Sequence, residues 1–324
     1  MKKQLLPWQL ALNSLQRNIP VMLLYVLHSQ GSSPGRQGFF MVVNSEGETQ
    51  GSIGGGIMEH KFIELAKEKL NAERETLKAG TIIKKQYHDK TATKDQSGMI
   101  CSGEQTNLLY PLQPQDEAVI QQLIDSLQEY KNGTLQLSPA GLQFSEDIPS
   151  KDFECTIYSE NDWIYTEKTG YKNHLYIIGA GHCALALSRL MQEMDFYIHL
   201  YDDRSSLKTF LENQSVHEKT VIEDYSELKD IIPAGDNSFV VVMTVGYRTD
   251  DIVLRTLLGK KIRYIGLLGS KNKTAQLFEH YEQEGIPVEL YQSIYAPIGI
   301  PISSQSPEEI AISIAAEIIQ VKNS

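Results

Sequence analysis

The chain has 324 residues, of which 41% are hydrophobic and 22% are charged, and its formal net charge at pH 7 is -11. This length allows two hydrophobic cores, because single cores rarely grow beyond about 250–300 residues, and the composition is typical of a folded globular protein. The acidic balance argues against a nucleic-acid or anionic-membrane partner, since binding either one needs a basic face.

Cysteine content and the N-terminal segment indicate the compartment. The three cysteines, Cys101, Cys155 and Cys183, are an odd number with no C-x-x-C pair, which suits free thiols in a reducing cytosol. Residues 1–18 hold no apolar run that could form a signal-peptide core, and no segment reaches the roughly 20 apolar residues of a membrane span. We therefore expect a cytoplasmic protein.

The N-terminal half mixes strands and helices. Apolar, β-rich runs predict strands at 21–28 and 39–44, which form a hairpin-like pair. From 131 to 172 the chain is polar and rich in turn residues, so we place a domain junction at its end. This gives a separate N-terminal α+β domain, residues 1–170. Its other expected elements are helices at 57–70 and 116–130, strand-like pieces between 80 and 110, and short strands at 155–158 and 163–165.

In residues 171–324, strand and helix alternate, which predicts a Rossmann-like, doubly wound parallel sheet and an α/β fold class. A capping box, Ser306 to Glu309 with Pro307 between, opens a last helix that is apolar nearly all round and is therefore expected to be buried. The expected strands are 175–178, 197–201, 220–222, 239–243, 264–267 and 293–295, and the helices between them include 182–194, 250–258 and 271–284.

A dinucleotide fingerprint, G-x-G-x-x-A, follows the first of these strands. Gly179 permits the tight turn, Gly181 lets the backbone approach a pyrophosphate, and Ala184 allows the helix to pack closely on the strand. The alternative is that the glycines only shape the turn. His182, in the first turn of the helix, can face a ligand or bond a nearby carbonyl.

Asp202 ends the second strand of this unit, where a ribose-binding acid of a dinucleotide fold belongs. Asp203 and Arg204 follow it, so the acidic pair can select a ribose hydroxyl or form a solvated loop. A further turn at the end of a strand, Gly269-Ser270-Lys271 with Lys273, is suited to an anion.

Two loops of the N-terminal half are also suited to anions. The loop 31–38 combines hydroxyls with a guanidinium, and the loop 51–56 feeds amide N–H groups into a helix whose Glu59 can cap it or meet a ligand. Cys101, beside glycines, can coordinate a soft metal or carry sulfur, or be inert. The candidate residues of the two loops are Ser32, Ser33, Arg36, Gly54, Gly55 and Gly56.

Six ordered segments together resemble the XdhC/CoxI family, accessory proteins of molybdenum hydroxylases such as xanthine dehydrogenase. The resemblance covers nearly the whole chain. The segments are GSSPGRQGFFMVV, GSIGGGIMEHKF, IIGAGHCALAL with YDDR, MTVGYRTDDIVLRTLL, YIGLLGSKNK and APIGIPISSQSPEEIAISIAAEII. The chain departs from the family pattern at Cys101-Ser102-Gly103, where two glycines commonly follow the cysteine, and at Val245, where the family often has histidine.

The resemblance implies a carrier or chaperone rather than an enzyme. Such a protein binds molybdenum cofactor (molybdopterin), protects it while its terminal sulfur is installed, and delivers it to an apo-hydroxylase. It further implies a cysteine desulfurase as a second partner, and we consider a homodimer. The glycine turns of both domains, Cys101 and the Gly269–Lys271 turn are then expected to hold one phosphorylated ligand. The alternatives are an NAD(P)-dependent oxidoreductase and a regulatory module that senses a nucleotide.

Overall fold

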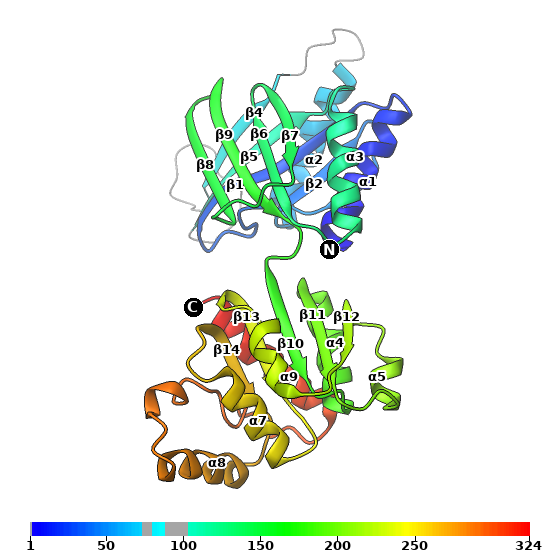
Figure 1. Cartoon of the computed structure of the whole chain (residues 1–324). Coiled ribbons are helices and arrows are strands. Elements are labelled where there is room, and N and C mark those ends of the chain that lie inside the picture. The colour runs from blue at the N-terminus through cyan, green and yellow to red at the C-terminus, as the bar shows by residue number, and fades with distance from the viewer. Residues whose placement is uncertain (1, 73–79, 88–102) are drawn as a thin grey trace. The chain divides into compact units, whose positions relative to one another are not determined.

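The structure is a computed structural model that describes residues 2–72, 80–87 and 103–324. The chain divides into two compact units, Met1–Gly170 and Tyr171–Ser324 (Figure 1).

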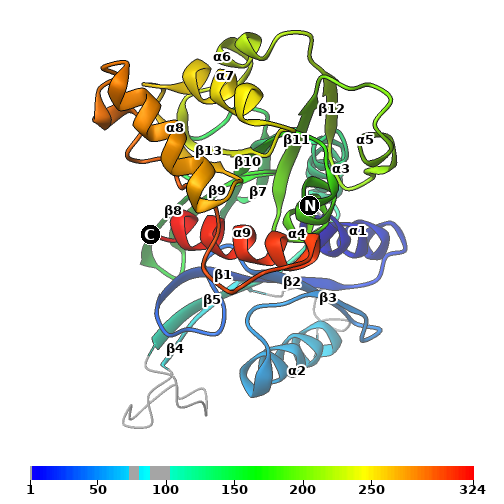
Figure 2. The same cartoon turned by 90° about the horizontal axis from the view of Figure 1, so that it is seen from below.

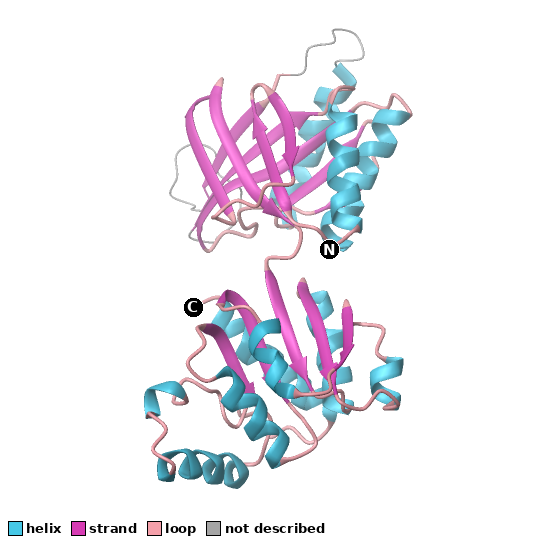
Figure 3. Cartoon of the chain, viewed as in Figure 1, coloured by secondary structure: helices cyan, strands magenta, loops and turns pink. Residues whose placement is uncertain are grey.

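The N-terminal unit combines two antiparallel sheets with helices (Figure 3). Its described elements are α1 (Lys2–Gln16), β1 (Val21–Gly31), β2 (Phe40–Asn44), β3 (Thr49–Gly51), α2 (Gly56–Ala72), β4 (Ile82–Tyr87), β5 (Gly103–Pro111), α3 (Asp116–Gln128), β6 (Gly133–Ser138), β7 (Gly141–Ser145), β8 (Phe153–Ser159) and β9 (Asp162–Thr169). The five-stranded sheet has the order β3-β2-β1-β5-β4, and the four-stranded sheet has the order β7-β6-β9-β8.

Side-chain alternation along β1 explains how its sheet is covered on both faces. Met22 and Leu24 pack in one apolar cluster with Phe62 of α2. Tyr25, one position along the strand, points to the opposite face, where its ring centroid lies 5.2 Å from that of Tyr165 in the second sheet. The expected hairpin is confirmed, since β1 pairs antiparallel with β2.

One element of this unit was not predicted, and one sheet was predicted only in part. The helix α1 contains Pro7, which obscures it in the sequence, and it buries Trp8 against Phe40 with ring centroids 5.1 Å apart. The short strands expected at 155–158 and 163–165 lie within β8 and β9, and the polar stretch after residue 131 forms a complete sheet with them. In β9, Trp163 and Tyr165 are buried and Ile164 between them is exposed.

The C-terminal unit is a parallel sheet between two layers of helices. Its elements are β10 (Asn173–Ile178), α4 (His182–Glu193), β11 (Phe196–Asp202), α5 (Lys208–Glu212), β12 (Glu218–Val221), the 3-10 helix η1 (Tyr225–Glu227), α6 (Leu228–Ile231), β13 (Gly235–Val242), α7 (Tyr247–Leu257), β14 (Ile262–Leu267), α8 (Lys271–Gln283), the 3-10 helix η2 (Val288–Leu290) and α9 (Pro307–Lys322). The strand order is β12-β11-β10-β13-β14, and every pair is parallel, which confirms the predicted Rossmann-like fold.

The helices divide between the two faces of this sheet. Leu175 and Ile177 of β10 pack with α4 and α9, which lie side by side in Figure 2. Tyr176 and Ile178, on the opposite face, pack with apolar residues of α6, α7 and α8. Since both faces are covered, the central strands read as continuous apolar runs.

Two expectations for this unit were wrong in detail. The sixth strand, 293–295, forms only an isolated bridge between Tyr295 and Gly266. Pro297 follows two residues later, and a proline has no N–H with which to extend the pairing. The last helix has the predicted capping box, but one side of it is open to solvent, because the Ile312 side chain is 52% exposed.

Candidate functional site

The glycine turn between β10 and α4 is built around two different requirements. Gly179 has φ 104° and a Cβ there would lie 2.3 Å from the carbonyl oxygen of Met243, so only glycine fits this close approach. Gly181 is the N-cap of α4 with φ -71°, and a Cβ there would meet no atom within 4 Å. The space in front of Gly181 is therefore open.

Asp202, at the end of β11, points into the protein behind this turn. Its Oδ2 accepts hydrogen bonds from Ala180 N (2.7 Å) and Arg204 Nη2 (2.8 Å). Its Oδ1 accepts from Arg204 N (2.9 Å) and Nε (2.8 Å). Burial raises the pKa of the Asp202 carboxyl, but these hydrogen bonds outweigh burial and hold the pKa below its ordinary value.

Four donors fill the acceptor capacity of the Asp202 carboxylate, which has about four lone-pair sites. The side chain is also fully buried. This carboxylate is thus engaged by the protein itself, and its position at the strand end does not make it free for a ribose hydroxyl.

A pocket of about 490 Å³ opens at the carboxyl ends of β10, β11 and β13. The strand order reverses between β10 and β13, and ligands of open α/β sheets bind at such a switch point. The volume lies within the usual range for small-molecule sites. The lining residues are Gly181, His182, Leu185, Arg204, Leu207, Lys208, Thr209, Glu212, Met243, Thr244 and Val245.

The lining of this switch-point pocket has basic and apolar parts. His182 and Arg204 contribute cationic or hydrogen-bonding groups, while Lys208 pairs with Glu212 at 3.6 Å. Leu185 lies among the apolar lining residues. The pocket can therefore bind an anionic group at one part and an apolar ring at another.

An ion pair with a buried carboxylate lies behind the β13 side of the pocket. Asp250, in the first turn of α7, is fully buried and pairs with Lys273 of α8. Asp250 Oδ1 accepts hydrogen bonds from the N–H (3.1 Å) and the hydroxyl (2.6 Å) of Thr244. Neither Thr244 nor Asp250 was predicted as a site residue. The sequence does place an acid, Asp250, in the first turn of the helix after Thr244, and this position could have indicated the contact.

The predicted turn Gly269-Ser270-Lys271 forms the start of α8. Ser270 is its N-cap and accepts a hydrogen bond from Lys273 N at 3.2 Å. Ser270 and Lys271 are exposed and do not line the switch-point pocket. The turn is linked to that pocket through Lys273, whose partner Asp250 holds Thr244.

In the N-terminal unit, the loop before α2 is bound by its own helix. Oε2 of Glu59 accepts hydrogen bonds from Ser52 Oγ (2.6 Å), Ile53 N (2.8 Å) and Gly55 N (3.0 Å). A carboxylate thus lies where amide groups at a helix start would hold an anion.

The two glycine-rich loops of this unit contact one another. A Cβ on Gly54 would lie 2.4 Å from Gly35 N, so the backbones are in direct contact. Gln105, fully buried on β5, holds both loops, because it accepts from Ser33 Oγ (2.7 Å) and donates to Ile53 O (2.9 Å).

The remaining predicted residues of these loops lie nearer the surface. Arg36 is exposed and donates to Gly31 O at 2.9 Å, and Ser32 and Gly56 are exposed. The structure brings these loops together, as the sequence suggested, and Gln105 is the residue that the sequence analysis missed.

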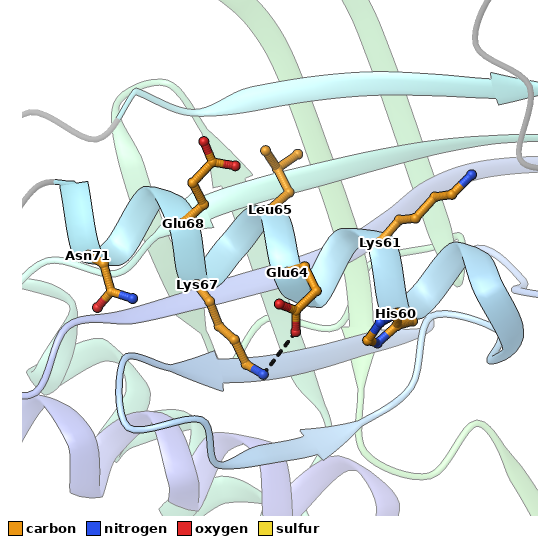
Figure 4. Close-up of a pocket in the computed structure, with 7 residues that line it drawn as sticks. All are labelled: His60, Lys61, Glu64, Leu65, Lys67, Glu68 and Asn71. Atoms are coloured by element: carbon orange, nitrogen blue, oxygen red, sulfur yellow. Dashed lines mark hydrogen bonds and ion pairs between the residues drawn. The ribbon is translucent and has the colours of Figure 1, made fainter.

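A second hollow runs along the outer side of α2 (Figure 4). All of its lining residues come from this one helix, and their side chains point in different directions. Lys67 pairs with Glu64 at 3.0 Å. Charges of both signs spread along a single exposed helix do not converge on a ligand, so we assign no site there. The lining residues are His60, Lys61, Glu64, Leu65, Lys67, Glu68 and Asn71.

The cysteines divide between described and undescribed parts. Cys101 lies outside the described residues. Cys155 and Cys183 are free thiols, and burial raises the pKa of Cys155 to about 11, which makes this thiol unreactive at neutral pH. Within residues 2–72, 80–87 and 103–324, no group of three or more histidine, cysteine or acidic side chains could hold a metal ion. In the same ranges, no helix has the length and apolar character needed to cross a membrane.

Comparison with known proteins identifies the family. Residues 175–318 match the family described as the XdhC Rossmann domain, and residues 14–80 match the XdhC and CoxI family. The chain belongs to the XdhC and CoxI family. Both parts of the XdhC pattern, the N-terminal loops and the Rossmann unit, are therefore present, as the motifs predicted.

Two curated relatives of this XdhC-family chain are considerably longer than the matched part. The chain is 24% identical over 313 residues to the uncharacterized protein YqeB of Escherichia coli (strain K12), covering 95% of this chain and 44% of YqeB. It is 27% identical over 186 residues to a probable xanthine dehydrogenase subunit of Bacillus subtilis (strain 168), covering 54% of this chain and 53% of that protein. The chain spans about half the length of the curated relatives it matches.

A solved structure shares the fold of the XdhC-family chain. The crystal structure described as a xanthine dehydrogenase from Bacillus halodurans aligns with a TM-score of 0.69 at 24% identity. The alignment covers 98% of this chain and 96% of that one.

Proposed function

We propose that this XdhC-family protein is an accessory factor that binds molybdenum cofactor and delivers it to a hydroxylase of the xanthine dehydrogenase type. The family assignment and the name of the Bacillus subtilis relative support a role connected with xanthine dehydrogenase. The switch-point pocket of the Rossmann unit is the observation that carries the binding part of the proposal.

The phosphate of the cofactor fits the basic part of this pocket. A guanidinium has five N–H donors, and Asp202 engages those on Nε and Nη2 of Arg204. The donors on Nη1 make no hydrogen bond within the described part of the chain, and the Arg204 side chain is 39% exposed. The first-turn amides of α4, which begins at His182, lack partners within their helix. Together these groups would hold a phosphate.

The pterin part of the cofactor fits the apolar lining. Leu185, Leu207 and Met243 line the same pocket as Arg204. An apolar wall beside a phosphate site would shelter a flat ring from water. When bound, the cofactor supplies the molybdenum and its sulfur ligands, and the protein's own residues hold and shield it.

The alternative, an NAD(P)-dependent oxidoreductase, is favoured by the glycine turn and the Rossmann sheet. The carboxylate that would bind a ribose diol in such an enzyme is already engaged by Ala180 N–H and Arg204. We therefore expect no micromolar binding of NAD(H) or NADP(H) in calorimetric titrations. Micromolar binding together with hydride transfer to a carbonyl substrate would favour the enzyme instead.

The binding test uses Gly181→Ala, because a Cβ there meets no protein atom and projects where the phosphate would approach. Purified chain is mixed with cofactor released from a molybdoenzyme and desalted, and the retained molybdenum is measured. The variant should retain at least about tenfold less than wild type while unfolding at the same temperature, since one displaced charge-assisted contact is worth about 1.5–3 kcal/mol.

Gly80→Ala is the matched control, since a Cβ on Gly80 also meets no atom within 4 Å and lies in the other unit. It should retain molybdenum like the wild type. Retention by the wild type no greater than by an unrelated protein would reject the proposal. Cys101→Ala tests the further prediction that this thiol contacts molybdenum or sulfur, in which case binding is lost.

The remaining parts of the proposal concern the protein's partners, its cellular compartment and its oligomeric state. We propose the cytoplasm as the compartment, an apo-hydroxylase as the recipient and a cysteine desulfurase as the source of the terminal sulfur. Co-purification of the chain with the subunits of a molybdenum hydroxylase would test the recipient directly. Ultracentrifugation of the purified chain would test the homodimer.

A further inference from the structure

Thr244 occupies a particular place in the switch-point pocket. It follows β13, lines the pocket and is half-buried. Behind it lies Asp250, whose side chain is fully buried and paired with Lys273. A buried carboxylate that faces an ammonium group has acceptors only and no proton to donate.

The single hydroxyl proton of Thr244 can be assigned from distances. The Thr244 oxygen lies 2.6 Å from Asp250 Oδ1 and 3.5 Å from the carbonyl oxygen of Gly246. The first distance is that of a strong hydrogen bond to an ionised acceptor, and the second is at the limit of hydrogen bonding. The hydroxyl therefore donates to Asp250.

A hydroxyl oxygen has one proton and two acceptor sites. Because the Thr244 proton is donated to Asp250, the oxygen of Thr244 can only accept a hydrogen bond from a ligand. The N–H of Thr244 also donates to Asp250, at 3.1 Å, so the residue is held at two points and cannot easily turn its hydroxyl around. Thr244 thus presents an acceptor to any ligand in the pocket.

From this geometry we infer that Thr244 is a specificity-determining residue, fixed as a hydrogen-bond acceptor, that selects ligands carrying an amino group. The inference rests on the proposed function and deepens it. Arg204, which follows β11, offers donors to a phosphate, whereas Thr244, which follows β13, offers an acceptor. The pocket favours a phosphorylated heterocycle whose ring bears an exocyclic amino group, as a pterin does.

Asp250 and Lys273 act as positioning residues in this scheme. Asp250 holds the hydroxyl of Thr244, and Lys273 pairs with Asp250 without entering the pocket lining. Replacing the Lys273 ammonium would act on a ligand only through Thr244.

The experiment compares two probes, pterin and pteridin-4(3H)-one, which has a hydrogen atom where pterin has its 2-amino group. The full chain should bind pterin about three- to tenfold more tightly than pteridin-4(3H)-one, the range of one neutral hydrogen bond. Thr244→Ser keeps the hydroxyl and should keep this preference. Thr244→Val removes it, and the two probes should then bind with equal affinity.

The outcomes separate this inference from the proposed function. Equal affinities for the two probes in the wild type, or the same preference in Thr244→Val as in Thr244→Ser, would overturn the inference and leave the carrier role standing. No binding of either probe by the wild type would also overturn the inference, while the carrier role would still be decided by the retention of molybdenum. Thr244→Ala is a second hydroxyl-free variant, to be used if Thr244→Val does not unfold cooperatively on heating.

Discussion

Each unit places a glycine-rich turn before a helix, but the two turns differ in what their amide groups contact. Before α2, the carboxylate of Glu59 accepts from Ile53 N and Gly55 N, so the protein supplies its own anion. Before α4, the carboxylate of Asp202 lies behind the turn and accepts from Ala180 N and from Arg204, while Gly181 faces an open pocket. The turn before α2 is thus occupied by a side chain of the chain itself, whereas the turn before α4 has space in front of it.

The glycines also differ in purpose. Gly54 is needed because the backbone of Gly35 touches it, whereas Gly181 has free space in front of it. The same residue type therefore serves loop-to-loop packing in the N-terminal unit and access to a pocket in the C-terminal unit.

The largest effect is expected from Gly54→Ala, which tests whether the N-terminal turn is a packing device. Its Cβ would lie 2.4 Å from Gly35 N, and its φ is +128°. A backbone clash and an unfavourable φ should together cost about 4 kcal/mol of unfolding free energy. Both tryptophans, Trp8 and Trp163, belong to this unit, so urea unfolding followed by tryptophan fluorescence reports on it.

Gly55→Ala is the matched control for this prediction. Its φ is +75° and its Cβ would meet no atom within 4 Å, so only the left-handed backbone costs energy, about 1 kcal/mol. Equal losses for the two variants would show that the contact with Gly35 does not matter.

The next effect is expected from Asp202→Asn, which tests the claim that this acid is structural. The amide cannot satisfy the Ala180 N–H and the Arg204 guanidinium together, so the C-terminal unit should lose about 3 kcal/mol. Asp203→Asn is the control, because the Asp203 side chain is 50% exposed and lies 3.6 Å from Arg204 Nε, and its loss should stay within about 0.5 kcal/mol. Hydrogen exchange of the β10 and β11 amides measures the loss of stability in each of the two variants.

The same Asp202 pair predicts a dependence on pH. The folded pKa of Asp202 lies below its ordinary value of 3.8, so its stabilisation is fully present above 3.8 and is lost as the pH falls through the folded pKa. The gap between wild type and Asp202→Asn should therefore narrow below about pH 4 in thermal unfolding followed by circular dichroism. A gap that stayed constant down to about pH 2 would contradict the pairing.

The smallest effect is expected from Glu59→Ala, which opens the N-terminal turn. Loss of hydrogen bonds to Ser52 Oγ, Ile53 N and Gly55 N should cost about 1–2 kcal/mol. Added inorganic phosphate should then stabilise the variant more than the wild type, because it can occupy the vacated amides.

Glu64→Ala removes the same charge from an exposed position of α2 and serves as the control for Glu59→Ala. It should respond to phosphate like the wild type in the fluorescence assay. A response of Glu59→Ala no larger than that of Glu64→Ala would mean that the turn cannot hold an anion even when empty.

Much of the fold could be predicted from local sequence. The apolar run of β10, Gly179, and the capping box at Ser306 act through neighbours within a few residues, so their pattern is visible in the chain. The order of motifs likewise identified the XdhC and CoxI family. Residues 293–295 were predicted as a strand from their pattern, but they form only the bridge at Tyr295. Pro297, which has no N–H, cannot extend the pairing.

The candidate site was predicted less completely. Gly181, His182 and Asp202 were named from their spacing, and the first two line the pocket. Thr244 and Asp250 were not predicted. Asp250 holds the Thr244 hydroxyl and pairs with Lys273, which lies on a different helix, so this arrangement is not visible in the local sequence.

By itself, the sequence determined the family, the strand–helix order of the Rossmann unit and the positions of the glycine turns, since each depends on residues close together along the chain. Only the tertiary structure decided which turn is open, because that depends on where Glu59, Asp202 and Arg204 point. A side chain's direction follows from packing and hydrogen bonds between separate elements. The carboxylate of Glu59 therefore occupies one turn from the front, whereas the carboxylate of Asp202 supports the other from behind.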